Sequence, residues 1–382
     1  MYWSFLLLTA ALLGAYCLLI LLYRQWYLRL PLFKRNPATP PLTRFSVIIP
    51  ARNEADNIVD CLETVLQQAY PPSLFEVILV NDHSTDATES LVAGLQKRYA
   101  NLQLINLTDH LNGKQLNAYK KKAIEIAIAA SKGDWIITTD ADCKVKSEWL
   151  ANYDGFIRQK DPVFVAAPVM FKDRMHFLSH FQSLDFISLQ GITAAAVSAG
   201  FHSMCNGANI AYKKQVFYEV EGFKGIDELA SGDDMLLMHK IRQEYPSRLG
   251  YLFSKEAIVE TEPMPDWKSF LQQRIRWASK AETYRDKMIF WILALVYAVN
   301  AALLILLLVG PFVERGLSNW LILIICKTLV ELTLMVPVAR FFDSGNLLSW
   351  FPLMQPFHIA YTVIAGWLGK FGSYEWKGRN VQ

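Results

Sequence analysis

The sequence GDWIITTDADC, residues 133–143, places two carboxylates directly after a short apolar run. Residues Trp135 to Thr139 are mostly apolar and β-branched, which predicts a buried strand. Asp140 and Asp142 follow it, and open α/β sheets bind ligands at the carboxyl ends of their strands. Two carboxylates so close together repel each other unless a cation lies between them, and a divalent metal is the usual solution. A surface turn in which one aspartate caps a helix is the alternative, and this stretch alone does not decide between the two.

The composition narrows the class of protein. The chain has 382 residues and a net charge of +3, which is too small to suggest a nucleic-acid partner. Hydrophobic residues make up 53% of the chain and gather at its two ends, which indicates membrane segments around a soluble part. The five cysteines form no CxxC pair and no metal-binding spacing, as expected for a soluble part in a reducing cytosol.

The N-terminal segment has the features of a membrane anchor. Residues 4–22 carry no charge, and the basic residues Arg24, Arg29, Lys34 and Arg35 follow directly. Positive charge stays on the cytoplasmic side, so we expect an anchor over 1–23 with its N-terminus outside. A signal peptide is disfavoured because no basic residue precedes the run and no small-residue cleavage site follows it. Residues 24–43 form a basic and proline-rich linker.

Strands and helices are predicted to alternate in the next segment, residues 44–265. Predicted strands cover 45–49, 75–80, 102–107 and 135–139, and predicted helices lie around 58–66, 84–95 and 119–130. This order predicts an α/β fold, a mostly parallel sheet with flanking helices. The sequence has no Gly-x-Gly-x-x-Gly after the first strand and no P-loop motif, which disfavours dinucleotide-binding and P-loop proteins.

Polar residues follow the first two strands as they follow the fourth. PARNE (50–54) and NDHSTD (81–86) therefore place amides and carboxylates at the sheet edge that carries Asp140 and Asp142. Such groups can bind a base and a ribose by hydrogen bonds. For Ser84, Thr85 and Asp86 helix capping is the alternative, and we expect it for at least one of them.

Taken together, these motifs resemble the family 2 glycosyltransferases with a GT-A fold. The resemblance lies in IIPARNE, NDHSTD and TDAD, and it extends to SGDD (231–234), which looks like the family's catalytic-base motif. QRIRW (273–277) fits the Gln-x-x-Arg-Trp motif of its membrane-integrated branch. The similarity covers about residues 45–280, and the motifs in this order are far more specific than any one of them.

The resemblance implies which residues bind the donor, a nucleotide-diphosphate sugar such as a UDP-sugar. The base would lie against Pro50, Ala51, Glu54 and Asp82, although the family has two acidic residues where this chain has Asn81 and Asp82. The family also places a lysine ahead of its Asp-x-Asp strand. Lys120, Lys121 and Lys122 match that spacing, with Lys114 as a second candidate, and we expect Lys120 or Lys121 to bind the nucleotide while the others are solvated.

The resemblance also implies the chemistry. Asp140 and Asp142 would bind the sugar nucleotide and its Mg²⁺ or Mn²⁺, which offsets the charge on the departing diphosphate. Asp234, preferred over Asp233, would take the proton from the acceptor hydroxyl, and a single displacement inverts the anomeric carbon to give a β-glycoside. Capping of a helix over 235–244 is the alternative for this pair, and we expect one of the two aspartates to serve as the cap.

The acceptor side is implied by two further motifs. Asn206 and Gly207 match a stretch that lies by the acceptor and donor sugar in the family, and Gln273, Arg276 and Trp277 match residues near the acceptor and diphosphate. Residues 266–285 hold an amphipathic helix that is expected to lie in the membrane interface. Membrane anchoring alone would explain its aromatic residues.

The C-terminal part is expected to return to the membrane. Residues 286–369 hold two or three transmembrane helices, with candidate spans at 289–310, 320–342 and 347–369 and a basic tail over 370–382. Lys327 and Glu331 are four residues apart and can form an intramembrane pair. Three spans would leave the tail outside, whereas its basic residues prefer the inside, so the third is either a true span or an interfacial segment.

The sequence thus predicts a multi-pass protein of the inner (plasma) membrane with a cytoplasmic catalytic domain. Its expected activity is inverting glycosyl transfer to a lipid or lipid-linked hydroxyl. A processive polysaccharide synthase of the same fold is the alternative within the family. A nucleotidyltransferase would need a glycine-rich phosphate loop near the first strand, and an inactive membrane scaffold would not need Asp140, Asp142 and Asp234 together.

Overall fold

The chain divides into two compact units, which are described separately below. The computed structural model describes all residues except 112, 114–115, 173, 230–231, 281–286, 372–373, 377–378 and 382. The sheet unit comprises Pro31–Lys172 and Ser203–Glu262, and the helical unit comprises Met1–Leu30, Asp173–His202 and Pro263–Gln382. Residues 173–202, expected within the 44–265 domain, therefore belong to the helical unit. Lys114 and Ser231, which we singled out from the sequence, lie outside the described residues.

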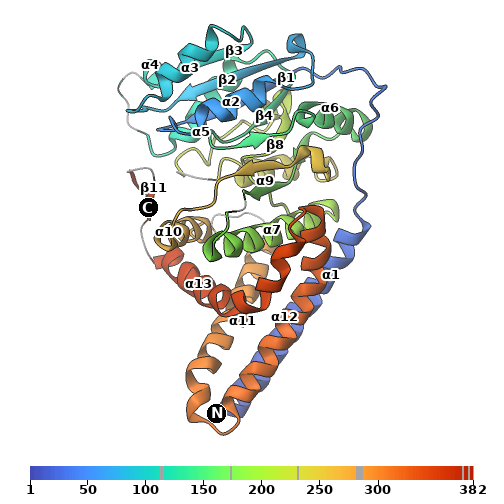
Figure 1. The fold of residues 1–382 in the computed structure, drawn as a ribbon, viewed down its shortest axis with the longest axis vertical. Coiled ribbons are helices and arrows are strands. Elements are labelled where there is room, and N and C mark those ends of the chain that lie inside the picture. The colour runs from blue at the N-terminus through green and yellow to red at the C-terminus, as the bar shows by residue number, and fades with distance from the viewer. Residues whose placement is uncertain are drawn as a thin grey trace. The chain divides into compact units, whose positions relative to one another are not determined.

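In the described part of the sheet unit, seven strands form one mixed sheet in the order β3-β2-β1-β4-β8-β6-β9 (Figure 1). Strands β3, β2, β1 and β4 pair in parallel, and β8 runs antiparallel to both of its neighbours. The strands are β1 (Phe45–Ala51), β2 (Phe75–Asn81), β3 (Leu102–Asn106), β4 (Trp135–Thr138), β6 (Phe164–Ala166), β8 (Ile210–Lys213) and β9 (Leu249–Tyr251).

Burial on both faces explains the apolar runs of the central strands. Val47, Ile48 and Ile49 of β1 are fully buried, as a parallel strand covered on both faces requires. Right-handed crossovers place α2 (Ile58–Leu66) and α3 (Thr88–Gln96) on one face, where they contact each other, and α5 (Tyr119–Ala130) on the other. The predicted α/β fold is confirmed.

Smaller elements complete the sheet unit. A second sheet joins β5 (Lys144–Val145), β10 (Val259–Thr261) and β7 (Val169–Phe171) in the order β5-β10-β7. The helices α4 (Thr108–Leu111), α6 (Trp149–Lys160) and α8 (Lys214–Glu219) each follow a strand, and α9 (Met235–Glu244) follows α8. Two short 3₁₀ turns are η1 (Pro72–Leu74) and η2 (Lys255–Ala257). Helix α9 matches the predicted 235–244. Helix α3 begins at Thr88, four residues later than predicted, because the side chains of Ser84 and Asp86 bond to the loop after β1 instead.

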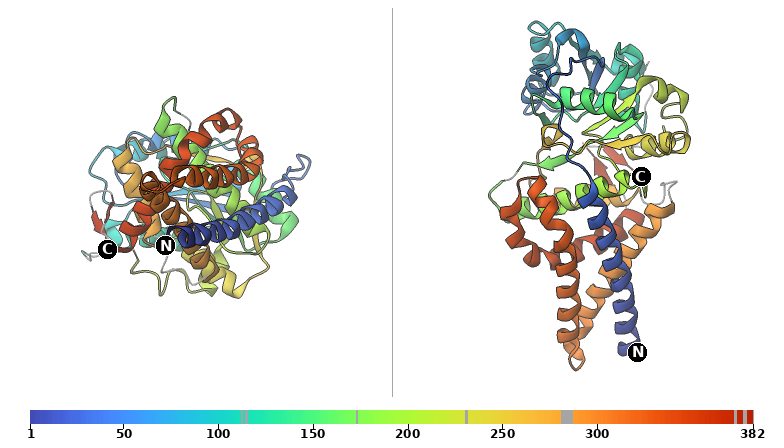
Figure 2. Two further views of the ribbon diagram at one scale, coloured as in Figure 1. Left: turned by 90° about the horizontal axis from the view of Figure 1, so that it is seen from below. Right: turned by 90° about the vertical axis from the view of Figure 1, so that its right-hand side faces the viewer.

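The helical unit is built from long helices. They are α1 (Tyr2–Arg29), α7 (Phe177–Ser198), α10 (Trp267–Ala278), α11 (Lys287–Val309), α12 (Gly316–Phe341) and α13 (Phe351–Phe371), with 3₁₀ turns η3 (Gly310–Phe312) and η4 (Gly345–Trp350) and a C-terminal hairpin of β11 (Tyr374–Trp376) and β12 (Arg379–Val381). Helix α1 contacts α7, α11 and α12. The N-terminus and the turn between α11 and α12 lie at the same end of this unit (Figures 1 and 2), where Asn319 donates to Tyr2 Oη at 3.3 Å.

Three helices in the described residues are long and apolar enough to cross a membrane: Tyr2–Arg29, Lys287–Phe312 and Gly316–Phe341. The predicted anchor and two of the predicted C-terminal spans correspond to them. The third candidate span, 347–369, falls in η4 and in α13, which has Pro356 inside it. It is not one of the three helices that are long and apolar enough to cross a membrane. Helix α7 was not expected; its Gly191 lets α12 approach so closely that a Cβ would lie 2.4 Å from Val338 Cγ2.

Candidate active site

Parallel pairing brings the ends of β1, β2 and β4 to one edge of the sheet. Ala51 is in register with Asn81, and Ile48 is in register with Thr138, so the residues that follow these strands meet there. The backbone N–H of Asp82 donates to the carbonyl of Ala51 at 2.7 Å, which fixes the first two loops against each other. Pro50 is half-buried and Ala51 is buried, and both belong to β1 itself. The candidate site lies at this edge, as predicted from the order of strands.

Lys120 joins the carboxylates of two motifs. Its Nζ lies 2.8 Å from Asp140 Oδ1 and 3.2 Å from Asp233 Oδ2. The side chain of Asp233 is only 11% exposed, so the ion pair with it is largely screened from water. Burial opposes the charged form of Lys120, but the charges of Asp140, Asp233 and Asp234 outweigh burial and raise its pKa. The ammonium is therefore the positive charge that holds these carboxylates together here.

Asp234 is fixed by two backbone amides. It is the N-cap of α9: its Oδ1 accepts from Met235 N at 2.7 Å, and its Oδ2 accepts from Gly207 N at 2.9 Å. We expected one aspartate of the Asp233–Asp234 pair to cap the helix, and that residue is Asp234. It is also the residue that we expect to be the base. The two roles are compatible, since a carboxylate has about four acceptor positions and capping uses two of them. Asp234 remains half-exposed.

Gly207 connects the base motif to the metal motif. Its carbonyl accepts from Thr138 Oγ1 at 2.9 Å, at the end of β4, while its N–H donates to Asp234. A Cβ at Gly207 would lie 3.4 Å from Asp234 Oδ2 and 3.5 Å from Asp233 Oδ2. Asn206, beside it, accepts from Ala208 N at 3.0 Å, which shapes the turn. These residues lie next to the carboxylates, where the sequence led us to expect them.

Asn209 is a buried anchor for this turn, and sequence reasoning assigned it no separate role. Its amide nitrogen donates to the carbonyls of Pro168 and Ala257, and its oxygen accepts from Trp149 Nε1 and Tyr153 Oη. It is fully buried. An asparagine two residues beyond a glycine turn is the signal that could have indicated such an anchor.

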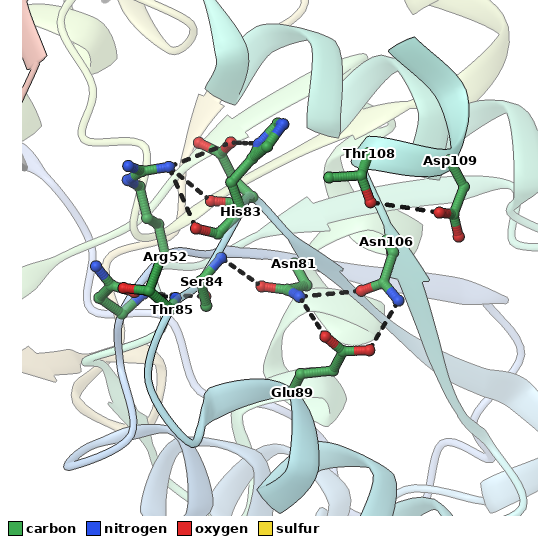
Figure 3. A network of polar contacts seen from close by, with 11 residues as sticks. Arg52, Asn81, His83, Ser84, Thr85, Glu89, Asn106, Thr108 and Asp109 are labelled. Atoms are coloured by element: carbon green, nitrogen blue, oxygen red, sulfur yellow. Dashed lines mark hydrogen bonds and ion pairs between the residues drawn. The ribbon is translucent and has the colours of Figure 1, made fainter. Parts of the chain in front are cut away.

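The loop after β2 is braced by the loop after β1. Asp82 is buried, its Oδ1 lies 2.8 Å from His83 Nδ1, and Arg52 donates to the Asp82 carbonyl at 3.1 Å. The His83 ring also meets the Tyr119 ring edge to face at 5.4 Å between centroids. Figure 3 shows Arg52 reaching across to the His83 segment. Sequence reasoning gave Arg52 no role of its own.

Asn81, where the resembled family has an acidic residue, belongs to a second polar cluster (Figure 3). Its Nδ2 donates to Asn106 Oδ1 at 3.0 Å and to Glu89 Oε2 at 3.3 Å, and Ser84 N donates to its Oδ1. Asn106 also donates to Glu89 at 2.9 Å. Asn81 therefore holds the loop that carries Asp82, and Glu89 supplies the negative charge to this cluster.

The remaining residues after β1 bond to the segment before α3. Glu54 N donates to Thr88 Oγ1 at 2.8 Å, and the Glu54 carboxylate accepts from Asn57 Nδ2 at 3.1 Å. Asn53 adopts φ 52°, in the left-handed region that asparagine tolerates, and accepts from Thr85 N at 2.8 Å. Asp86 accepts from Thr88 N at 3.0 Å, but the N-cap residue of α3 is Ala87 and no side chain among the described residues caps this helix, so the capping expected of Ser84, Thr85 or Asp86 is not found.

The donor set at the end of β4 fits a hard cation better than a soft one. Asp140 and Asp142 offer carboxylate oxygens, which Mg²⁺ and Mn²⁺ prefer. The nearby thiols of Cys61 and Cys143 are buried; burial and the charge of Asp142 raise the pKa of both, which keeps them neutral. In the described residues no three His, Cys, Asp or Glu side chains are grouped to hold a metal. The fit therefore rests on these two carboxylates.

The three lysines of α5 differ in their surroundings. Lys122 is half-exposed and pairs with Glu125 at 3.0 Å, whereas Lys121 is 2% exposed. The Lys121 ammonium donates to the carbonyls of Ile226 and Leu229, at 2.6 Å each. Of the two lysines expected to bind the nucleotide, Lys120 reaches the carboxylates directly, and Lys121 is engaged with backbone.

In the helical unit, Gln273 and Trp277 surround Arg274. Gln273 Oε1 accepts from Arg274 Nη1 at 2.7 Å, and the Arg274 guanidinium lies 4.3 Å from the centre of the Trp277 ring. Arg274 forms a buried ion pair with Asp185 of α7 at 2.7 Å, and Tyr361 of α13 donates to the same carboxylate. Arg276 is half-exposed. Sequence reasoning missed Arg274 and Asp185; an aspartate within the apolar run of α7 was the available signal.

Comparison with known families decides the class of protein. A model of the glycosyl transferase family group 2 matches residues 135–368, and a model of glycosyl transferase family 2 matches residues 46–220. The chain is a family 2 glycosyltransferase. The resemblance in its motifs is thereby confirmed, and the family matches include the Asp140–Asp142 motif, the Asp233–Asp234 motif and α10.

Other glycosyltransferases are similar to parts of this one. Glycosyltransferase AglE of Haloferax volcanii is 34% identical over 112 residues, which are 29% of this chain and 34% of AglE. Probable glycosyltransferase YdaM of Bacillus subtilis is 27% identical over 270 residues, 67% of this chain and 59% of YdaM. This glycosyltransferase therefore matches less than two thirds of the length of these relatives.

A solved structure shares the fold over almost its whole length. The mannosyltransferase PcManGT from Pyrobaculum calidifontis, in complex with GDP-Man and Mn²⁺, superposes with a TM-score of 0.61 and 19% identity. The match covers 96% of this chain and 98% of PcManGT. The predicted GT-A type of fold with terminal apolar helices is confirmed at this level.

Proposed function

We propose that this glycosyltransferase is membrane-bound and inverting, and that it moves a sugar from a nucleotide-diphosphate sugar to a hydroxyl of a lipid or lipid-linked acceptor. The observation that carries the proposal is the cluster in which Lys120 contacts both Asp140 and Asp233 while Gly207 and α9 hold Asp234. These contacts support a donor site at Asp140 beside a base at Asp234, both within the sheet unit. Such an arrangement suits group transfer from the donor to an incoming hydroxyl.

Asp140 and Asp142 are proposed to hold Mg²⁺ or Mn²⁺ together with the donor. When bound, the metal offsets the negative charge that develops on the departing diphosphate. Lys120, which pairs with Asp140, is proposed to contribute positive charge to the same diphosphate. The base of the nucleotide would lie against Pro50, Ala51, Glu54 and Asp82. A UDP-sugar is our first candidate, and GDP-Man, bound by PcManGT, is the alternative donor to test.

The reaction we propose is a single displacement. The acceptor oxygen forms a bond to the anomeric carbon as the bond from that carbon to the diphosphate oxygen breaks, and the nucleoside diphosphate leaves with the bonding electrons. Asp234 takes the hydroxyl proton on an oxygen whose position is set by its two backbone amides. One displacement inverts the configuration, so an α-linked donor gives a β-glycoside.

A lipid or lipid-linked acceptor and a membrane location are supported by two observations. In the part of the chain that the structure describes, three helices are long and apolar enough to cross a membrane. A relative, the beta-monoglucosyldiacylglycerol synthase of Nostoc sp., is 29% identical over 105 residues, 28% of this chain and 21% of its own length. The Gln273, Arg276 and Trp277 motif is proposed to serve the acceptor and diphosphate. We place the sheet unit in the cytoplasm, at the inner (plasma) membrane.

The test is a donor screen with the full chain in lipid nanodiscs. Sugar nucleotides with UDP or GDP are supplied with Mg²⁺ or Mn²⁺ and extracted membrane lipids, and release of nucleoside diphosphate and the lipid products are measured. We expect one donor to give a single β-linked glycolipid and no release with EDTA. Lack of turnover with every donor, while the protein remains folded, would contradict the proposal.

Polysaccharide synthesis is the second candidate, because the Gln-x-x-Arg-Trp spacing at 273–277 is common in processive synthases of the resembled family. The same assay separates the two. A ladder of products of increasing length indicates processive synthesis, whereas a single addition indicates a lipid glycosyltransferase.

A further inference from the structure

The loop of residues 222–229 lies between α8 and α9 and leads into the Asp233–Asp234 motif. It begins at Gly222, whose φ is +50°, and turns again at Gly225, whose φ is +81°. A Cβ at Gly225 would meet nothing within 4 Å, so its glycine serves the backbone conformation rather than close packing. A segment with two such turns has many alternative conformations, and something must select the observed one.

Lys121 holds the second half of this loop. Lys121 belongs to α5 and is buried. Its ammonium donates to the carbonyls of Ile226 and Leu229 at 2.6 Å each. Removing an ammonium from water is costly, and an apolar side chain of similar length would fill the space without that cost. The presence of a lysine here, rather than an apolar residue, is therefore best explained by the two carbonyls that its ammonium binds.

Lys240 holds the first half in the same way. It belongs to α9, and its ammonium donates to the carbonyls of Gly222 at 2.6 Å and Lys224 at 2.9 Å. Two lysines from two helices thus bind four carbonyls of one short loop. Their helices also carry the site: Lys120 precedes Lys121 on α5, and Asp234 caps the start of α9.

We propose that Lys121 and Lys240 are positioning residues that clamp the 222–229 loop and so set where Asp233 and Asp234 meet Lys120 and Gly207. This inference rests on the proposed role of Asp234 as base. Loss of either clamp should leave donor binding intact and move the base away from the acceptor hydroxyl. A displacement of about 1 Å at such a position can cost about 100-fold in rate.

The experiment compares Lys121→Met and Lys240→Met with two control variants, Lys122→Met and Lys224→Met, in the full chain. Lys122 is a half-exposed lysine on the same helix as Lys121 and pairs with Glu125. Lys224 is an exposed lysine in the loop itself and pairs with Glu221. The measurements are kcat, KM for the donor, metal-dependent binding of the nucleoside diphosphate, and amide hydrogen exchange of residues 222–229. We expect kcat to fall by about 100-fold in the clamp variants, with KM and nucleotide binding unchanged and faster exchange in the loop.

A second measurement separates positioning from simple loss of stability. Lys121→Ala is assayed with added ethylammonium, which can restore the buried charge, and with propanol as a neutral control. Recovery of kcat by ethylammonium alone supports the clamp. If kcat and loop exchange in both clamp variants match those of the controls, or if KM rises with kcat unchanged, the inference is wrong. Inactivity of the wild-type chain would instead refute the proposed function, while hydrogen exchange would still test the clamp.

Discussion

Asp234 shows how one carboxylate can be both structural and reactive. Its two backbone amides come from different motifs, Met235 at the start of α9 and Gly207 after the turn at Asn206. Any proton that it accepts must use its remaining acceptor positions, so their direction is fixed by the fold rather than by solvent. Asp233, one residue earlier, is instead neutralised by Lys120. The adjacent aspartates therefore differ in their partners.

Replacing Asp234 by Asn separates these roles, because Asn is as good an N-cap as Asp but a far poorer base. Asn keeps one acceptor oxygen, but its NH2 group would face the second backbone amide, so we expect Asp234→Asn to lose about 1–3 kcal/mol of stability. We expect it to keep metal-dependent nucleotide binding and to lose glycosyl transfer by about 10²–10⁴-fold. Asp142→Asn is the matched variant and should lose both binding and transfer. Nucleotide titration and product formation are the measurements; undiminished transfer by Asp234→Asn would remove it as the base.

Lys120 leads to a prediction that needs no substrate. Without its ammonium, Asp140 and Asp233 lose their shared counter-charge and repel each other. We expect Lys120→Met to unfold at a lower temperature than wild type in EDTA, and to gain more from added Mn²⁺, because the metal replaces the missing charge. Lys122→Met is the control. An equal response of the melting temperature to Mn²⁺ in all three proteins would show that Lys120 does not substitute for a cation.

At the scale of elements, Gly133 determines how β4 enters the sheet. A Cβ there would lie 2.5 Å from Ser46 N and 2.6 Å from the Phe45 carbonyl carbon, and backbone atoms of β1 cannot move aside. We expect Gly133→Ala to destabilise the protein by about 1–3 kcal/mol, as overpacking does. Gly94→Ala is the control, since a Cβ in the middle of α3 would meet nothing within 4 Å and should stabilise that helix by up to about 1 kcal/mol. Chemical denaturation of both variants measures the difference.

Helices and strands whose apolar residues recur at a regular spacing could be predicted from the sequence. Elements whose position depends on packing against other segments could not. Helices α5 and α9 begin and end where the spacing of apolar residues predicts, and β1, β2 and β4 match within two residues. Helix α7 is buried on most sides and carries polar residues along its whole length, so its sequence offers no contrast between faces. The carboxylates of the site were predictable because strand ends converge. The contacts of Lys121 and Lys240 could not be predicted, because these lysines bind backbone carbonyls, and a backbone carbonyl has no signature in the sequence.

At the scale of the whole molecule, the helical unit contains a buried polar cluster. Lys327 pairs with Glu331 at 2.7 Å and donates to Gln355 of α13, and Tyr16 of α1 donates to Glu331. The predicted pair of Lys327 and Glu331 is present, and its contacts join three helices. We expect Lys327→Met to destabilise the protein by about 3–5 kcal/mol by leaving the Glu331 charge unpaired, and the double variant with Glu331→Gln to recover much of it. Unfolding in detergent with SDS measures both, and a double variant that loses as much stability as Lys327→Met, or more, would contradict the pairing.

The number of spanning helices determines the membrane topology that we predict. With α1 entering and α11 and α12 forming a return pair, the chain ends on the side of the linker, where its basic residues are favoured. The N-terminus and the α11–α12 turn lie at one end of the helical unit, as two segments on the outer side should. We therefore expect Glu314→Cys to react with an impermeant maleimide in intact cells, and Asn36→Cys and Lys370→Cys to react only after lysis, each in a background without the native cysteines. Labelling of Lys370→Cys in intact cells would show that α13 also crosses the membrane.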